Sequence, residues 1–359
     1  MAEENEDQGL VKAFGKLLNL VVFLLLVILG LFTALIYTNS SKQKKSVVTA
    51  IERSFVVENS GSQNLNPVID TTHYWNAPDE ANLATDPKKE RVLYGKELIA
   101  HTSIYFGPKG TISKESTNGM NCQNCHLNAG TKVFGNNYSA VATTYPKYRA
   151  RSGTKEDIPK RVNDCFERSL NGKTLKIDSK EMQSIIAYLK WLGKDVPAGK
   201  KPAGSGFQQI AYLERAADPE KGKLVYVQKC QSCHQQSGEG LMNSDGTAFT
   251  YPPLWGDHSY NNGAGLYRLS NFARFVKYNM PMGASHTNVQ LSDEEAWDVA
   301  AFVNSQPRPK KDLKKDWPKI EEKPFDHPYG PYADSFSESQ HKNGPYQPIL
   351  DASAKTKKK

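Results

Sequence analysis

The 359 residues allow two domains of ordinary size with appendages, and the net charge of +8 is modest for this length. Five cysteines are too few for a small protein held together by disulfides; two pairs of them share one spacing and the fifth stands alone. Lysines close the sequence at 357–359, which we interpret as a solvated end, and we expect no nucleic-acid partner. The basic balance favours small anions and acidic proteins as partners.

An apolar run of 21 residues without charge occupies residues 17–37. As a helix it spans roughly 30 Å, the thickness of the hydrocarbon core of a bilayer. The run is longer than the apolar part of a signal peptide, and residues 36–39 make a poor cleavage site. We therefore predict one transmembrane anchor at 17–37, with a cytoplasmic N-terminus at 1–16 and a polar stalk at 38–85.

The next part of the chain, residues 86–196, follows a plan of opening helix, CxxCH motif, long loop and closing helix. Apolar spacing predicts the opening helix over 90–106. The motif CQNCH stands at 122–126. A closing helix is predicted over 179–194, with Ser179 as its N-cap.

The same plan returns in residues 215–306. An opening helix at 218–229, with an aspartate cap and a proline at its first position, leads into CQSCH at 230–234. A closing helix is predicted at 292–306. A linker rich in proline and glycine, residues 197–214, joins the copies, and residues 307–359 are predicted to form an extended tail rich in proline and lysine.

Each CxxCH motif is typical of covalent haem attachment. The two thiols reach the vinyl groups of one haem, and the adjacent histidine ligates the iron. The alternative, a four-cysteine zinc site, does not account for a histidine after both pairs. The sequence therefore predicts two covalently bound haem c groups, with proximal ligands His126 and His234. The attachment cysteines are Cys122, Cys125, Cys230 and Cys233.

The sixth iron ligand of the second domain is predicted from YNMPMG at 278–283. This segment lies between the haem motif and the closing helix, where small cytochromes place a methionine followed by proline. We choose Met280 over Met282. A bis-histidine haem through His258 or His286 is the alternative.

The first domain has no methionine in the matching interval and has Cys165 instead. A lone cysteine is usually a small buried apolar residue. Here it occupies the position of the distal ligand in its copy of the plan, so we predict that its sulfur ligates the first iron. A thiolate lowers the reduction potential of a haem, whereas a His/Met pair raises it.

Haem attachment also bears on location. The lysines around the apolar run slightly favour a cytoplasmic position for the bulk of the chain. Covalent attachment in bacteria takes place outside the cytoplasm, so we expect a single-pass protein of the cytoplasmic (inner) membrane whose haem domains face the periplasm.

Several longer blocks resemble one family. The stretches CHLNAGTK (125–132), YPKYRARSG (145–153) and RVNDCFERSLNGK (161–173), with EMQSIIAYLKWL (181–192) and residues 215–234, closely resemble the dihaem thiosulfate dehydrogenases. The resemblance covers roughly residues 90–305. It implies a mainly α fold: two class I cytochrome c-like domains in tandem, here preceded by one transmembrane helix.

The resemblance also implies roles. The first haem, ligated by His126 and Cys165, would be catalytic, and Arg151, Arg161 and Ser169 match family residues that bind substrate. Arginine forks suit tetrahedral oxyanions such as thiosulfate. The second haem would pass electrons onward.

The expected reaction joins two thiosulfates as tetrathionate, with a small cytochrome c or a membrane oxidase as electron acceptor. Tetrathionate reduction by the same site, or a non-catalytic electron-transfer subunit, are the alternatives. Some family members place a lysine just before the distal methionine; this chain has Asn279 there, so we expect no ligand switch.

Overall fold

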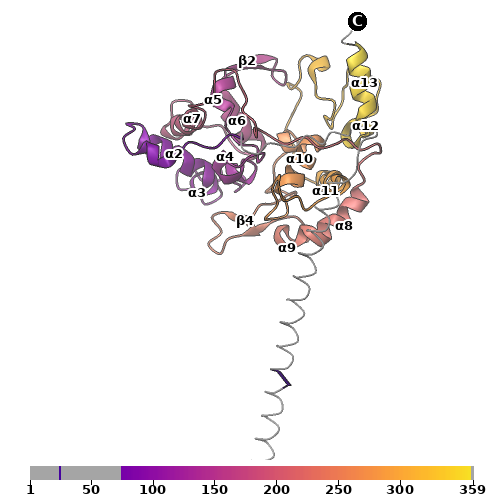
Figure 1. Ribbon diagram of the computed structural model, residues 1–359, viewed down its shortest axis with the longest axis horizontal. Coiled ribbons are helices and arrows are strands. Elements are labelled where there is room, and N and C mark those ends of the chain that lie inside the picture. The colour runs from indigo at the N-terminus through magenta and orange to yellow at the C-terminus, as the bar shows by residue number, and fades with distance from the viewer. Residues whose placement is uncertain (1–23, 26–73, 357–359) are drawn as a thin grey trace, which may run out of the picture. The chain divides into compact units, whose positions relative to one another are not determined.

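Two packed helix pairs form the framework of the protein, for which the computed structural model describes residues 24–25 and 74–356 (Figure 1). One pair is α2 (Lys89–Ala100) against α7 (Lys180–Leu192). The other is α8 (Pro219–Lys229) against α11 (Asp293–Ser305). Each pair joins the opening and closing helices of one predicted copy, so the fold is mainly helical and built twice.

A glycine stands where each pair comes closest. A Cβ atom on Gly95 of α2 would lie 2.0 Å from the carbonyl oxygen of Ser184. A Cβ atom on Gly222 of α8 would lie 1.9 Å from the carbonyl oxygen of Asp298. No side chain fits at such distances, so glycine lets the two backbones meet. The same device in both domains indicates that they share one packing geometry.

Apart from α6 and α10, the other elements are short. Those of the first domain are η2 (Glu80–Leu83), α3 (Thr102–Phe106), η3 (Cys122–Asn124), α4 (Leu127–Gly130), α5 (Val141–Thr144), β1 (Lys147–Arg149), β2 (Thr154–Glu156) and α6 (Ile158–Arg168). Those of the second are α9 (Gln231–His234), β3 (Leu241–Met242), β4 (Phe249–Tyr251), η4 (Gly265–Tyr267) and α10 (Leu269–Asn279). The strands form two antiparallel hairpins, β1–β2 and β3–β4.

Local sequence explains where the main helices begin. The Ser179 side chain accepts a hydrogen bond from the Met182 amide and caps α7, as predicted. Ser292 and Glu295 form a capping box at the start of α11. The predicted helix 90–106 is interrupted instead: α2 ends at Ala100 and α3 begins at Thr102.

Each domain has its own apolar core. The first contains the buried side chains Leu98, Phe106, Phe166, Met182, Tyr188 and Leu192. The second contains Tyr226, Phe272, Phe275, Trp297 and Val303. Direct hydrogen bonds also join the domains, because Asn118 Nδ2 donates to the Ser259 carbonyl at 3.0 Å and the Asn261 amide donates to the Arg168 carbonyl at 3.0 Å.

The tail packs onto the second core. After η5 (Ile320–Glu322), the helices α12 (Glu338–Asn343) and α13 (Gln347–Thr356) close the described chain. Tyr346 and Ile349 are 2% and 3% exposed and belong to the second core. Asp326 is fully buried and accepts hydrogen bonds from Arg268 and Ser270. These contacts make the tail part of the folded body.

The predicted membrane anchor lies almost entirely outside the described residues. Among the described residues, no helix combines the length and the apolar character needed to cross a bilayer. Apart from Leu24 and Leu25, the predicted anchor at 17–37 and the predicted stalk as far as residue 73 lie outside the described residues.

Candidate functional site

The two motif histidines are held in the same way. His126 Nδ1 lies 2.6 Å from the carbonyl oxygen of Asn136, and His234 Nδ1 lies 2.8 Å from that of Pro252. Burial lowers the pKa of His126 to about 4 and lowers the pKa of His234 as well, so both imidazoles are neutral near pH 7. A neutral ring that donates from Nδ1 keeps the lone pair of Nε2 available for a metal.

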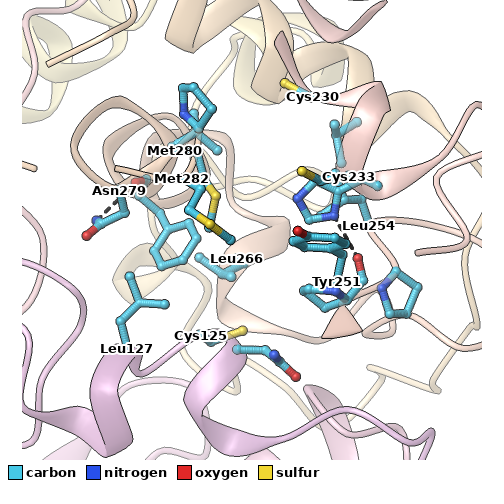
Figure 2. Close-up of a pocket in the computed structure, with 18 of the residues that line it drawn as sticks. Cys125, Leu127, Cys230, Cys233, Tyr251, Leu254, Leu266, Asn279, Met280 and Met282 are labelled. Carbon is cyan, nitrogen blue, oxygen red and sulfur yellow. Dashed lines mark hydrogen bonds between the residues drawn. The ribbon is translucent and has the colours of Figure 1, made fainter. Parts of the chain in front are cut away.

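The second domain contains a cavity of about 450 Å³. Cys230, Cys233 and His234 line it, and Met280 and Met282 face them across it (Figure 2). Met280 is the C-cap of α10, where the following proline prevents the helix from continuing. Met282 is 72% exposed, which makes Met280 the better placed of the two sulfurs.

The alternative histidines point elsewhere. Neither His258 nor His286 lines the cavity. The His286 ring packs edge-on against Tyr74 and Phe134 at centroid distances of 5.1 and 5.4 Å. Asn279, just before Met280, lines the cavity and donates to the Phe275 carbonyl at 3.1 Å.

The first domain contains a cavity of about 300 Å³ lined by Cys122, His126, Arg161 and Cys165. Asp157 caps α6 by accepting from the Lys160 amide. The helix places Arg161 and Cys165 one turn apart on the same face, and Arg161 Nη1 donates to Cys165 Sγ at 3.1 Å. The predicted proximal and distal residues of the first haem therefore line one cavity.

The charge of Arg161 is coupled to the neighbouring sulfur. The neighbouring Cys165 is the main cause that raises the pKa of Arg161. A guanidinium that stays charged at this distance stabilises a thiolate. The thiolate is the form of cysteine that binds metals and attacks electrophiles. Tyr138 completes the wall, its ring stacked on that of His126 at 4.4 Å.

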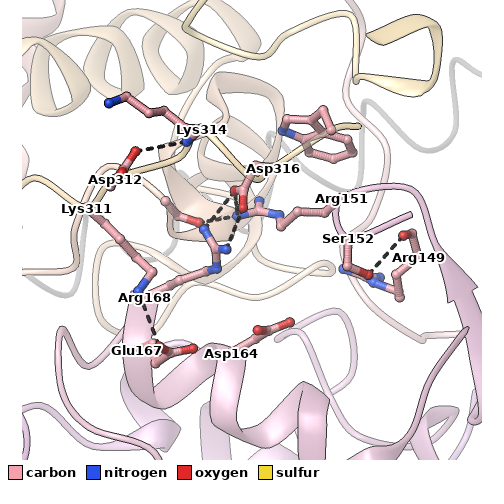
Figure 3. Close-up of polar contacts among 12 residues, drawn as sticks. Arg149, Arg151, Ser152, Asp164, Glu167, Arg168, Lys311, Asp312, Lys314 and Asp316 are labelled. Atoms are coloured by element: carbon pink, nitrogen blue, oxygen red, sulfur yellow. Dashed lines mark hydrogen bonds and ion pairs between the residues drawn. The ribbon is translucent and has the colours of Figure 1, made fainter. Parts of the chain in front are cut away.

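Two of the predicted substrate residues lie outside this cavity. Arg151 Nη1 donates to the Gly263 carbonyl at 2.6 Å and contacts Asp316 at 3.4 Å (Figure 3). Its guanidinium also stacks over Trp317. Ser169 caps the end of α6, where its amide donates to the Cys165 carbonyl at 2.9 Å. Neither residue lines the cavity, so the structure brings together Arg161 and Cys165 but not Arg151 and Ser169.

Three other cations line the first cavity and were missed by the sequence analysis: Lys147, Arg149 and Lys201. The sequence did offer a signal for two of them. Lys147 and Arg149 are two residues apart, and such residues lie on the same face of a strand. Lys201 comes from the predicted linker, and no local pattern connects it to the site.

The two cavities approach each other at the first haem motif. Cys122 lines the first cavity, whereas Cys125 and Leu127 line the second, together with residues of the other domain (Figure 2). A four-cysteine zinc site would require all four thiols to surround one point. Cys122 lines the first cavity, whereas Cys230 and Cys233 line the second, so the four thiols do not meet.

The donors present fit haem c in both domains. The first cavity has the motif cysteine Cys122, a neutral histidine fixed through Nδ1 and the sulfur of Cys165. The second has two motif cysteines, a histidine fixed in the same way and the sulfur of Met280 on the opposite wall. The second cavity is also rich in apolar side chains, among them Leu266, Phe272, Phe275 and Leu291. This donor set is that of a covalently attached haem with a histidine and a sulfur ligand.

Comparisons with known proteins agree with this assignment. Residues 112–198 match the SoxA/TsdA cytochrome c domain family, and residues 219–307 match the cytochrome c family. The chain is 38% identical over 244 residues to a thiosulfate dehydrogenase of Psychrobacter arcticus, covering 67% of this chain and 71% of the relative. It is 41% identical over 196 residues to a thiosulfate dehydrogenase of Allochromatium vinosum, covering 54% of this chain and 71% of the relative.

A solved structure shows the same fold. The thiosulfate dehydrogenase TsdBA of Marichromatium purpuratum superposes with a TM-score of 0.61 at 29% identity and covers 68% of this chain. This chain spans about half of that protein, 51% of its length. The chain therefore belongs to the thiosulfate dehydrogenase family, with two cytochrome c domains in tandem that each carry one covalently bound haem c.

Proposed function

We propose that the protein oxidises two thiosulfate ions to one tetrathionate ion in the first domain. The observation that carries this proposal is the placement of Cys165 in the first cavity, which His126 also lines, with its sulfur 3.1 Å from Arg161. A domain that only relayed electrons would need no thiolate beside a guanidinium. The relatives named as thiosulfate dehydrogenases support thiosulfate as the substrate.

The chain's own residues supply the sulfur chemistry in two steps. When bound, the two haems accept the two electrons that the reaction releases, one each. Cys165 forms a bond between its sulfur and the outer sulfur of one thiosulfate; the thiolate (charge −1) and the dianion (charge −2) give a Cys–S–S–SO₃⁻ adduct and two electrons. The outer sulfur of a second thiosulfate then attacks the sulfur that lies between Cys165 and the sulfonate. The bond to Cys165 breaks, tetrathionate is released and the thiolate is restored.

Arg161 balances the charge during these steps. It faces the sulfur before the first bond forms and again when the thiolate leaves, so it stabilises the nucleophile and the leaving group alike. Its fork of donors can also hold a sulfonate oxygen, which would orient the first thiosulfate toward Cys165.

We propose that the second domain carries the electrons out of the site. Cys125, an attachment residue of the first haem, lines the cavity of the second. This contact supports a short route between the two haems. Ligation by Met280 would give the second haem the higher potential, so electrons would run from the first domain to the second and then to a small cytochrome c or a membrane oxidase.

We also propose that the protein works at the outer face of the cytoplasmic membrane. The uncharged apolar run at 17–37 has the length of a membrane span. Haem attachment to CxxCH outside the cytoplasm supports a periplasmic position for both domains. Alkaline extraction of membranes, followed by proteolysis of intact spheroplasts, tests this arrangement: the full chain should stay in the membrane, and the haem domains should be cleaved.

Replacing Cys165 tests the proposed chemistry. Cys165→Gly should lose turnover while both haems remain attached, because the variant lacks the sulfur that forms the adduct. Cys165→Met is the matched variant: it restores a sulfur ligand but cannot form a disulfide-type bond, so it should be inactive as well. Haem content is measured by the absorbance of the denatured haemochrome. An active glycine variant would refute the adduct, and an active methionine variant would reduce Cys165 to an iron ligand.

A further inference from the structure

The hairpin β1–β2 presents two cations to the first cavity. Lys147 and Arg149 share one face of β1 and line the cavity. Tyr148, between them, points away: its side chain is 48% exposed and its hydroxyl donates to Glu322 of the tail at 2.6 Å. The tail contact fixes the strand from its outer side, so the two cations stay turned inward.

The charge of this cavity is one-sided. Its lining includes Lys147, Arg149, Arg161 and Lys201 and contains no aspartate or glutamate. Arg161 already serves Cys165. Arg149 Nε forms an ion pair at 3.9 Å with the buried Glu156, which is the cross-strand partner of Lys147 but does not line the cavity. Among residues 74–356, neither Lys147 nor Lys201 forms an ion pair. Burial lowers the pKa of Lys147 to about 8, so the ammonium remains mostly charged at pH 7.

We propose that Lys147 binds thiosulfate in the first cavity, with Arg149 and Lys201 beside it, in the role that the family resemblance would give to Arg151. Arg151 is committed to Gly263 and Asp316 and does not line the cavity. Two thiosulfate dianions must come together near Cys165, and each repels the other. Lys147 supplies a charge that no carboxylate of the cavity lining neutralises. This inference rests on the proposed function.

The test compares Lys147→Met with Lys155→Met. The first substitution keeps an unbranched side chain one atom shorter than lysine and removes its charge. Lys155 stands on β2 of the same hairpin, is exposed and does not line the cavity, so its variant controls for net charge and hairpin stability. In steady-state assays, Lys147→Met should raise KM for thiosulfate about tenfold, the effect of one lost charge-assisted hydrogen bond. Its kcat should change little, and Lys155→Met should match the wild type.

A binding measurement separates this inference from the proposed function. Equilibrium dialysis of radiolabelled thiosulfate against electrochemically reduced protein, which cannot oxidise it, should show about tenfold weaker binding for Lys147→Met than for Lys155→Met. Unchanged binding would overturn the inference even if the wild type makes tetrathionate. Weaker binding with no turnover by the wild type would support the inference and refute the proposed function.

The reduction potential of the first haem provides a third readout. A lysine that served the haem carboxylates would, on substitution, lower that potential and leave thiosulfate binding unchanged. Redox titration without thiosulfate should give the same potential for the wild type and Lys147→Met. A lowered potential with normal binding would assign Lys147 to the haem and overturn the inference.

Discussion

Asp316 of the tail binds two arginines of the first domain. Asp316 accepts two hydrogen bonds from Arg168, at 2.9 and 2.8 Å, and contacts Arg151 at 3.4 Å. The three side chains are only 9%, 13% and 14% exposed. Burial and the neighbouring Arg168 together lower the pKa of Arg151 to about 10, which indicates that the two guanidiniums repel each other. Asp316 is therefore the charge that makes this arrangement possible.

Replacing Asp316 by asparagine should be costly. The variant leaves two buried guanidiniums without a counter-charge, and breaking a buried pair in this way costs about 3 kcal/mol. The free energy of unfolding is measured on haem-loaded protein by urea titration with circular dichroism, and limited proteolysis reports release of the tail. Asp312→Asn is the control, because Asp312 is exposed and, within residues 74–356, its side chain accepts a hydrogen bond only from the Lys314 amide (Figure 3).

Comparing Asp316→Asn with Asp312→Asn separates the effect of the buried ion pairs from that of losing one negative charge. Asp312→Asn should change stability by less than about 0.5 kcal/mol. If Asp316→Asn also lost less than about 1 kcal/mol and left the tail equally resistant to protease, the other contacts of the tail would be sufficient to hold it. The reasoning from the buried ion pairs would then be refuted.

Two further predictions concern the second domain. Met280→Ala should lower the reduction potential of the second haem while Met282→Ala leaves it unchanged, because Met280 is partly buried in the cavity and Met282 is 72% exposed. Redox titration checks this, and equal effects of the two variants would contradict the assignment. A chain ended after Gln306 should lose about 4 kcal/mol of stability, because Tyr346 and Ile349 leave the second core. A shorter truncation that keeps both side chains is the control, and equal urea midpoints for the two truncations would contradict the prediction.

The sequence predicted the parts of the fold that local signals encode. The caps Ser179 and Ser292 mark the helices α7 and α11 because a side-chain oxygen at an N-cap satisfies nearby amides. The two CxxCH motifs and the duplicated plan follow from spacing alone. The break in the predicted helix 90–106 was missed because its apolar spacing continues through the break, while the Thr102 hydroxyl bonds back to the Leu98 carbonyl.

The site was predicted where one helix turn determines it and missed where distant segments do. Arg161 and Cys165 are four residues apart on α6, so their contact is local. The position of Arg151 outside the cavity depends on its contact with Asp316, which lies 165 residues away in the tail. Lys201 reaches the cavity from the linker. Such pairings depend on how the tail and linker pack, and no periodicity in the sequence records them.

The central claim is that the protein joins two thiosulfates at Cys165 and releases two electrons. A steady-state assay of the purified, haem-loaded protein with thiosulfate and ferricyanide tests it most directly. The account predicts one tetrathionate formed for every two thiosulfates consumed and every two ferricyanides reduced. No thiosulfate-dependent reduction, with both haems intact in the spectrum, would contradict the account and would leave the chain as an electron-transfer subunit.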